Sequence, residues 1–374
     1  MFTYLDVSAA VHHRAGLGRY AESLVRALQP LMPDELALFY NREHGVTPLT
    51  GLGPLPMSAT VGLGYKPWRM LVWLGQLAHF PFNRLLPDAS LFHATEHLLL
   101  PLRGVPTVLT VHDLIFRHLP GHHKRLNRWY LNLTMPLFCR RATHLIAVSE
   151  TTRRDLIAAY GLPPEKITVI REAADPRFCT QPKETIAAVR ARHGLPEQFL
   201  LYVGTIEPRK NLVRLLHVWE ALYQTGDVPP LVIVGRRGWL SDDFFAALEQ
   251  SPARQGVLLT GYVSDEDLPA LYSAATAFVF PSLYEGFGLP PLEAMACGTP
   301  VLCSDASSLP EVVGGAALLF DPEDPEAIAE ALRTTAKDAA LRERLRVEGL
   351  RRAAEFSWDR AARETVEVYK RVRS

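Results

Sequence analysis

Two successive series of short apolar runs, each alternating with helical patterns, constrain the fold of this chain most strongly. The first series comprises residues 2–7, 36–40, 89–93, 107–111, 143–148 and 167–170, and the second comprises residues 199–204, 230–234, 256–260, 276–280, 299–303 and 317–320. Apolar strands separated by helices form parallel sheets that are covered on both faces. The pattern therefore predicts an α/β protein with two doubly wound, Rossmann-like domains, whose ligands bind at the carboxyl ends of the strands.

The chain length and a pause in the strand signals predict the domain boundaries. A length of 374 residues exceeds one ordinary hydrophobic core. Strand signals stop between Asp175 and Glu197, where several prolines appear. We therefore expect an N-terminal Rossmann-like domain over residues 1–178, a linker over 179–196 and a C-terminal Rossmann-like domain over 197–355. A closing helix is expected over 356–374.

The segment that begins at Glu285 and ends at Glu293, with the sequence Glu-Gly-Phe-Gly-Leu-Pro-Pro-Leu-Glu, predicts a ligand site. It follows the apolar run 277–281 and indicates a strand, a glycine-containing loop and a short helix. Gly286 and Gly288 allow backbone N–H groups to approach a ligand, and a helix start favours anions. The flanking carboxylates suit hydroxyl groups. Phosphate and hydroxyl contacts together describe a nucleotide-sugar site, and the alternative is a capped helix with two solvated glutamates.

A pair of adjacent cations follows the first strand of the second series. Residues 204–211 have the sequence Gly-Thr-Ile-Glu-Pro-Arg-Lys-Asn, so that Arg209 and Lys210 stand between a strand and a helix. Arginine binds phosphate as a fork and lysine binds it as a point charge, and together they can neutralise a diphosphate. The alternative is a pair at a helix start that faces water.

The Glu285–Glu293 segment resembles the E-x7-E motif of retaining glycosyltransferases of family four, which adopt the two-domain GT-B architecture with a cleft between the domains. The resemblance extends from the glycines near residue 16 to a closing helix near residue 372, which in the family crosses back to the first domain. It implies that Glu293 accepts hydrogen bonds from the donor's ribose and that Glu285 lies nearer the sugar. It also implies that Lys210 contacts the donor diphosphate, and we expect Gly286, Phe287, Gly288 and Leu289 to bind the donor as well.

Two further details depend on the resemblance. Many members of the family have an arginine directly after the strand glycine, but this chain has Thr205 there, which leaves Arg209 as the second cation. Gly16 and Gly18 match a family loop that approaches the donor phosphates. By itself the G-x-G pattern is weak, and a plain helix-start loop is the alternative.

His112 and Asp113 follow the apolar run 107–111 and fall where an α/β domain places reactive groups. The resemblance implies that His112 lines the sugar pocket and that Asp113 supports it; the alternative is a capping aspartate with a satisfied histidine. Ser149 and Glu150 match another family position, although a helix N-cap explains them equally well.

The sequence offers no convincing metal site. Residues 93–97 read His-Ala-Thr-Glu-His, a zinc-hydrolase pattern, but that pattern requires a long helix and His93 closes a predicted strand. We expect no metal ligands.

The chain carries equal numbers of basic and acidic residues, but their distribution is uneven. Residues 1–175 carry 18 Lys and Arg against 13 Asp and Glu, so this half is the one expected to meet an anionic partner. Within it, residues 117–141 combine Arg and Lys with Trp, Tyr, Leu and Phe and contain no acidic residue. This segment predicts an interfacial amphipathic helix, an anionic-acceptor site or a solvated basic helix, and the sequence does not choose among them.

The start of the chain reads as a strand rather than a signal peptide, and Cys139, Cys179, Cys297 and Cys303 form no C-x-x-C pair. We expect buried free thiols and a cytoplasmic protein, with peripheral contact at the inner face of the membrane as an option.

These expectations combine into one hypothesis. The chain is expected to be a retaining, metal-independent hexosyltransferase that uses a nucleoside-diphosphate sugar and a saccharide or lipid-linked acceptor. Residues 197–355 are expected to bind the nucleotide sugar, and residues 1–178 are expected to form the acceptor side. The sequence of residues 204–211 resembles that of mannosyltransferases of surface polysaccharide assembly, so GDP-mannose is the first donor to consider. Catalytic roles fall to His112, Asp113 and Glu285. The alternatives are a sugar-nucleotide epimerase of the same architecture and a non-catalytic binder of sugar nucleotides; a nicotinamide oxidoreductase would require a tighter glycine turn.

Overall fold

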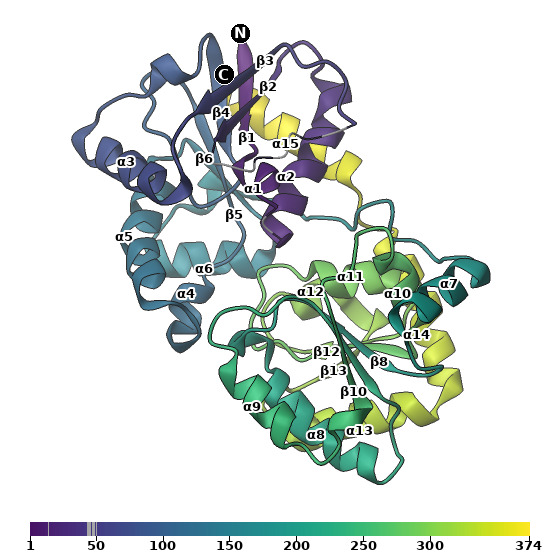
Figure 1. Ribbon diagram of the computed structural model, residues 1–374. Coiled ribbons are helices and arrows are strands. Elements are labelled where there is room, and N and C mark those ends of the chain that lie inside the picture. The colour runs from purple at the N-terminus through teal and green to yellow at the C-terminus, as the bar shows by residue number, and fades with distance from the viewer. Residues whose placement is uncertain (14, 43–45, 47–48, 50) are drawn as a thin grey trace. The chain divides into compact units, whose positions relative to one another are not determined.

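The computed structural model describes all residues except 14, 43–45, 47–48 and 50. The described chain divides into two compact units (Figure 1). Unit 1 comprises Met1–Leu114, Arg125–Glu172 and Ser357–Ser374, and unit 2 comprises Ile115–Lys124 and Ala173–Phe356. Each unit contains one parallel sheet, as the two series of apolar runs predict.

Unit 1 is built on a seven-stranded sheet within the described residues, with the order β3-β2-β1-β4-β5-β6-β7. Its strands are β1 (Phe2–Asp6), β2 (Leu36–Asn41), β3 (Met57–Val61), β4 (Ala89–Ala94), β5 (Thr107–Val111), β6 (His144–Ala147) and β7 (Ile167–Val169). Its helices are α1 (Ser8–Val11), α2 (Ala15–Leu28), α3 (Tyr65–Ala78), α5 (Arg125–Arg141), α6 (Glu150–Tyr160) and α15 (Trp358–Arg373). All strand pairs are parallel, as expected for strands connected through helices.

Unit 2 has a six-stranded parallel sheet with the order β10-β9-β8-β11-β12-β13 among the described residues. Its strands are β8 (Leu200–Val203), β9 (Leu231–Val234), β10 (Val257–Gly261), β11 (Ala277–Phe280), β12 (Val301–Ser304) and β13 (Leu318–Phe320). Its helices are α4 (Ile115–His118), α7 (Lys183–His193), α8 (Leu212–Gln224), α9 (Asp242–Gln250), α10 (Leu268–Ala274), α11 (Leu289–Ala296), α12 (Leu309–Val313), α13 (Pro325–Lys337) and α14 (Ala339–Ala353). Short 3₁₀ turns occur in both units.

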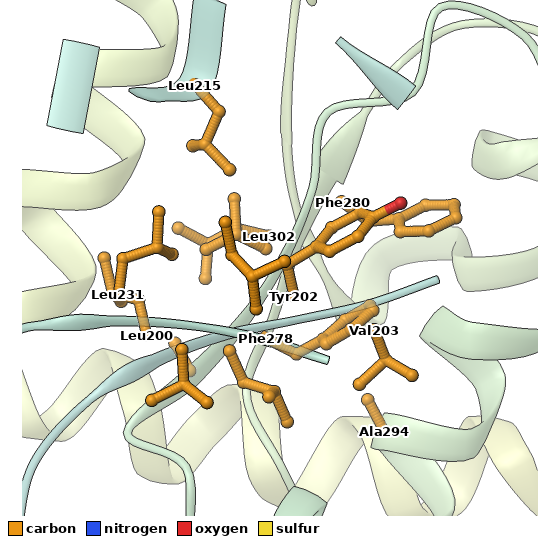
Figure 2. Packing of buried hydrophobic residues seen from close by; sticks show 14 of the residues in the cluster. Leu200, Tyr202, Val203, Leu215, Leu231, Phe278, Phe280, Ala294 and Leu302 are labelled. Carbon is orange, nitrogen blue, oxygen red and sulfur yellow. The ribbon is translucent and has the colours of Figure 1, made fainter. Parts of the chain in front are cut away.

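The core of unit 2 is formed by side chains from both faces of its sheet (Figure 2). Tyr202 of β8 stacks on Phe280 of β11 with ring centroids 6.1 Å apart, and Phe278 stacks on Phe280 at 5.7 Å. Leu215 of α8 and Ala294 of α11 belong to the same buried cluster. Because these strands are buried on both faces, they read as continuous apolar runs in the sequence.

The C-terminal helix α15 packs on unit 1, as the resemblance implies. It contacts α2, and Figure 1 shows the yellow C-terminal helix beside the purple N-terminal one. Trp358 at its start lies edge-on to Tyr20 of α2, with ring centroids 5.8 Å apart. Near its end the hydroxyl of Tyr369 lies 2.6 Å from Nδ1 of His93 in β4.

Several local expectations differ from the structure. Residues 179–196, expected as a linker, contain helix α7, which packs against α10 of unit 2. Strand β3 has no counterpart in the apolar runs, because its side chains alternate between exposed and half-buried positions at the sheet edge. Of the four cysteines expected to be buried, Cys179 is exposed and the other three are buried free thiols.

Candidate functional site

The sheet of unit 2 reverses its strand order between β8 and β11. The chain continues from β8 to β9 on one side, and from β11 to β12 on the other. The loops that leave such a pair of strands separate and leave a crevice at the carboxyl ends, which is where α/β sheets bind ligands. Residues 204–211 leave β8 and residues 281–288 leave β11, so both predicted motifs of unit 2 lie at this point.

Backbone contacts join these two loops. The N–H of Leu283 donates a hydrogen bond of 2.9 Å to the carbonyl of Arg209. The guanidinium of Arg209 donates in turn to the carbonyl of Tyr284 at 3.2 Å. The structure therefore brings together the cation pair and the glycine-containing loop, which are about 75 residues apart in the sequence.

The side chains of the two loops form a buried charge cluster. Nζ of Lys210 lies 2.5 Å from Oε1 of Glu285, and Nη1 of Arg209 lies 2.7 Å from Oε2 of the same carboxylate. Nε of Arg209 lies 2.5 Å from Oε1 of Glu207. Lys210 also lies over the ring of Phe280, 4.6 Å from its centroid. Because two cations face two carboxylates, the cluster is close to neutral although Lys210, Glu207 and Glu285 are all buried.

Burial and charge shift the pKa values of this cluster in opposite directions. Burial alone would raise the pKa of Glu285, but the charges of Arg209 and Lys210 and their hydrogen bonds bring it down to about 2. Burial, together with the positive charge of Arg209, lowers the pKa of Lys210. Burial raises the pKa of Glu207, whose Oε2 has no hydrogen-bond partner among the described residues. Glu285 is therefore the carboxylate that is firmly ionised in this cluster.

A serine pair holds the backbone of the 285–288 loop. The N–H of Glu285 donates to Oγ of Ser307 at 2.8 Å. Oγ of Ser308 lies 2.9 Å from the carbonyl of Glu285 and 2.7 Å from that of Phe287. Both serines follow β12, so the neighbouring strand connection fixes the loop.

The loop ends at a helix start that offers few donors. Gly288 has a φ of +128°, a backbone conformation that residues with a side chain rarely adopt. A Cβ atom at this position would also lie 2.9 Å from Cδ2 of Leu309. The first turn of α11 contains Pro290 and Pro291, which have no N–H. In the described part of the chain, the N–H groups of Gly288 and Leu289 have no protein acceptor. These two groups are therefore the donors that the start of α11 offers to an anion.

The remaining residues of the motif are buried. Phe287 is 4% exposed and lies edge-on to Phe356 at 5.9 Å, and Gly286 is buried beside it. Glu293 is 2% exposed in α11, and its Oε2 accepts a hydrogen bond of 3.0 Å from the hydroxyl of Tyr272. Tyr272 thus orients the carboxylate for which the sequence predicts ribose contacts.

In unit 1, His112 lies directly after β5 with both ring nitrogens engaged. Nε2 lies 2.9 Å from the carbonyl of Thr95, and Nδ1 lies 3.0 Å from Oε1 of Glu172. The ring also lies edge-on to Tyr20, with centroids 4.6 Å apart. Burial would lower the pKa of His112, but the hydrogen bond and the charge of Glu172 raise it. Since carbonyl and carboxylate oxygens only accept, each ring nitrogen faces an acceptor, an arrangement that favours the imidazolium form. Its neighbour Asp113 is half-buried.

The predicted glycines of unit 1 lie in the first turns of α2. Gly16 is exposed, and a Cβ atom there would meet nothing within 4 Å. Gly18 is buried, and a Cβ atom there would lie 2.9 Å from the carbonyl oxygen of Ala9. Gly18 therefore allows α1 and α2 to pack closely, whereas Gly16 leaves open space beside the helix.

Two other sequence patterns have a structural explanation. Oγ of Ser149 accepts from the N–H of Thr152 at 3.0 Å, so Ser149 is the N-cap of α6. His93 of the His-Ala-Thr-Glu-His pattern lies in β4, with its nitrogens 2.6 Å from the Tyr369 hydroxyl and 2.8 Å from that of Thr110. Over the residues that the structure describes, no group of three or more His, Cys, Asp and Glu side chains is arranged to hold a metal ion.

Sequence reasoning missed two acidic residues. Glu207 lies within the 204–211 motif and binds Arg209, but the sequence predicted no role for it. Glu172 follows β7 and binds His112. The rule that selected His112, a polar side chain just beyond a buried strand, would also have selected Glu172.

Comparisons with known proteins identify the class. Residues 14–178 match the family described as "Glycosyltransferase Family 4", and residues 186–352 match "Glycosyl transferases group 1". The chain is 37% identical over 369 residues to O-antigen chain mannosyltransferase B of Escherichia coli, covering 95% of this chain and 96% of that protein. It is also 32% identical over 285 residues to the serotype-specific mannosyltransferase WbdA of Escherichia coli, covering 73% of this chain but 34% of WbdA.

Solved structures support the same fold. A sucrose-phosphate synthase of Thermosynechococcus elongatus superimposes with a TM-score of 0.79 at 21% identity, covering 100% of this chain and 99% of that one. HepE of Anabaena, crystallised with UDP and glucose, superimposes with a TM-score of 0.75 at 19% identity, covering 99% and 100%. The two sheets thus define a GT-B protein. The chain belongs to glycosyltransferase family 4, and it is an enzyme of that class.

No helix among the described residues is long and apolar enough to cross a membrane.

Proposed function

We propose that this glycosyltransferase moves a mannosyl group from a nucleoside-diphosphate mannose, with GDP-mannose as the first candidate, to a saccharide or lipid-linked acceptor with retention of configuration. The choice of mannose is supported by the 37% identity to an O-antigen chain mannosyltransferase that is matched over nearly its full length. The observation that carries the proposal is the meeting of Arg209, Lys210 and the 285–288 loop at the switch point of the unit 2 sheet.

Departure of the diphosphate develops negative charge on the leaving group. Arg209 and Lys210 supply two cations, and Gly288 and Leu289 supply two backbone donors at a helix start. Fixed donors in a buried site stabilise such charge more strongly than water does, because they need no reorganisation during the reaction. The positive groups of this chain would therefore carry the electrostatic part of catalysis.

Glu285 has a second role in this proposal. Without donor, its carboxylate accepts from both cations. A bound diphosphate competes for the same N–H groups, so that donor binding would turn Glu285 towards the sugar hydroxyls. Glu293, oriented by Tyr272, would accept from the ribose hydroxyls. We assign His112 and Asp113 to the sugar pocket because of the family resemblance.

Retention follows from attack on the face that the leaving group departs from. The bond between the anomeric carbon and the diphosphate oxygen breaks, and the acceptor oxygen forms its new bond on the same face. The acceptor proton passes to the departing phosphate oxygen, so that no protein nucleophile is needed. The proton transfer to the departing phosphate is inferred from the family resemblance.

Mass spectrometry of GDP-mannose incubated with and without a mannose-containing acceptor tests the proposal. Transfer requires an acceptor product and GDP, formed only when both substrates are present. Conversion of the donor alone, or binding without turnover, would contradict it. A thermal-shift series with GDP, UDP and ADP tests the base, and activity lost to a chelator and restored by a divalent ion would overturn the metal-independent mechanism.

A further inference from the structure

The guanidinium of Arg209 lies between two carboxylates that differ in their access to solvent. The side chain of Glu207 is 1% exposed, whereas those of Arg209 and Glu285 are 19% and 11% exposed. Arg209 therefore extends from an enclosed carboxylate towards a more open one. A diphosphate that arrives from the solvent meets Glu285 before it meets Glu207.

The two carboxylates bind different atoms of Arg209. Oε1 of Glu207 lies 2.5 Å from Nε, whereas Oε2 of Glu285 lies 2.7 Å from Nη1, which also donates to the carbonyl of Tyr284 at 3.2 Å. Displacement of Glu285 from Nη1 therefore leaves the contact of Glu207 with Nε in place. In the described part of the chain, Oε2 of Glu207 is buried without a hydrogen-bond partner. This oxygen can accept a second N–H of Arg209, which gives the bidentate arrangement that guanidinium and carboxylate groups favour.

The backbone around Glu207 is held on both sides. The N–H of Gly238, in the loop after β9, donates to the carbonyl of Ile206 at 3.0 Å. A Cβ atom at Gly238 would lie 2.6 Å from that carbonyl oxygen and 3.4 Å from Cβ of Glu207, so the loop packs directly against residue 207. On the other side, the N–H of Lys210 donates to the carbonyl of Glu207 at 3.0 Å and closes the 3₁₀ turn of residues 208–210. Glu207 is thus a fixed point beside the cation pair.

We propose that Glu207 is a positioning residue that keeps Arg209 directed at the donor diphosphate after the diphosphate has displaced Glu285. This inference rests on the proposed function, in which Arg209 and Lys210 bind the leaving group. Glu207 holds Nε and a second N–H, so that the remaining N–H groups of Arg209 face the phosphates. Donors that are fixed in advance stabilise developing charge without reorganisation, whereas an untethered arginine loses rotamer entropy when it becomes ordered. Glu207 itself does not touch the substrate.

A double-mutant cycle between Glu207 and Arg209 tests the proposal. Turnover is measured for the wild type, Glu207→Ala, Arg209→Ala and the double variant, with the sugar nucleotide that the wild type uses. We expect Glu207→Ala to lower kcat by at least about ten-fold when Arg209 is present, and by less than about two-fold when it is already alanine. An equal loss in both backgrounds would overturn the proposal, since Glu207 would then support the unit in general. Unchanged turnover in Glu207→Ala would overturn it as well.

Glu207→Gln is the conservative variant, because its amide oxygen can still accept from Nε of Arg209. It should keep kcat within about three-fold of the wild type, and a loss as large as that of Glu207→Ala would contradict the positioning role. The matched control is Glu343→Ala, which breaks another glutamate–arginine pair of unit 2, the surface pair with Arg346 on α14. It should turn over like the wild type, and a comparable loss in this control would also count against the proposal.

NMR of the Nε–H group of Arg209 tests the contact without turnover. Its signal is identified by its loss in Arg209→Ala. It should be protected from exchange with water both in the free protein and at saturating nucleoside diphosphate, with the base that the thermal-shift series selects. In Glu207→Ala the protection should disappear. Loss of protection in the wild type on addition of the nucleotide would overturn the inference. A wild type that transfers no mannose would contradict the proposed function but leave this measurement intact, so the two failures are distinguishable.

Discussion

Replacing Glu285 by glutamine removes the charge that both cations of the site share. Its two carboxylate oxygens accept from Lys210 and from Arg209, at 2.5 and 2.7 Å. Glutamine has nearly the same shape, but its amide nitrogen would face one of the cations with a donor instead of an acceptor. Lys210 and Arg209 would then have Glu207 as their nearby carboxylate, and its pKa is raised by burial. Removing one partner from a buried ion pair is costly because the other charge is left uncompensated.

The pKa of Glu285 gives the magnitude. Burial would raise it, but Arg209 and Lys210 lower it from 4.5 to about 2. At about 1.4 kcal/mol per pH unit, the difference corresponds to about 3 kcal/mol of stability at neutral pH. Because the folded-state pKa is depressed, this contribution is fully present above pH 4.5 and is lost as the pH falls towards 2. The stability gap between wild type and Glu285→Gln should therefore be largest at pH 7 and shrink below pH 4.5.

Hydrogen exchange of peptides from β8 and β11 measures the opening free energy of unit 2 separately from that of unit 1. The matched control is Glu249→Gln, which changes an exposed glutamate of α9 and should leave exchange unaltered. The same Glu285 variant should bind GDP more tightly but turn over at least about ten-fold more slowly, because the cations are released for phosphate while the sugar-side carboxylate is lost. Unchanged exchange at pH 7, or a gap that is constant down to pH 3, would refute the assignment of the charge cluster.

Three other substitutions test the remaining parts of the site. Lys210→Ala should lower turnover by at least about ten-fold, equivalent to about 1.4 kcal/mol of transition-state stabilisation, and near-normal GDP release in a steady-state assay would refute its role. Glu293→Ala should weaken GDP binding in calorimetry, and an unchanged dissociation constant would argue against the ribose contact. Glu172→Gln should lower the pKa of His112, because the substitution removes the carboxylate charge that raises this pKa. An NMR titration measures the pKa, and the His112 signal is identified by its loss in His112→Gln. An unchanged titration midpoint in Glu172→Gln would contradict the pairing.

The sequence predicted the fold because both sheets are parallel and covered. Each of the twelve expected apolar runs coincides with a strand, within two residues at either end. These runs were visible because parallel strands are buried on both faces and therefore carry apolar residues at consecutive positions. The edge strand β3 was missed for the opposite reason, since Ser58 and Thr60 are exposed and no residue of the strand is fully buried.

The site was predicted as a set of residue types but not as a set of contacts. Placing Arg209, Lys210 and Glu285 at the carboxyl ends of strands required only the strand pattern. That Glu285 would accept from both cations required the strand order of unit 2, because it is the adjacency of β8 and β11 that joins their loops. A local pattern contains no information about which strands are neighbours, and for the same reason the pairing of His112 with Glu172 across 60 residues was not foreseen.

Arg209 is the second cation beside Lys210 in this chain, whereas the family resemblance places an arginine directly after the strand glycine in many members. Here Thr205 stands in that place, and its Cγ2 lies 2.6 Å from where a Cβ atom of Gly238 would be. Ile206 bridges to Arg237, and a Cβ atom at Gly235 would lie only 1.9 Å from the carbonyl oxygen of Gly204. The backbone after β8 is thus packed against the loop after β9. The cation four residues later, Arg209, is held by Glu207 and by the carbonyl of Tyr284, and it meets the same carboxylate as Lys210.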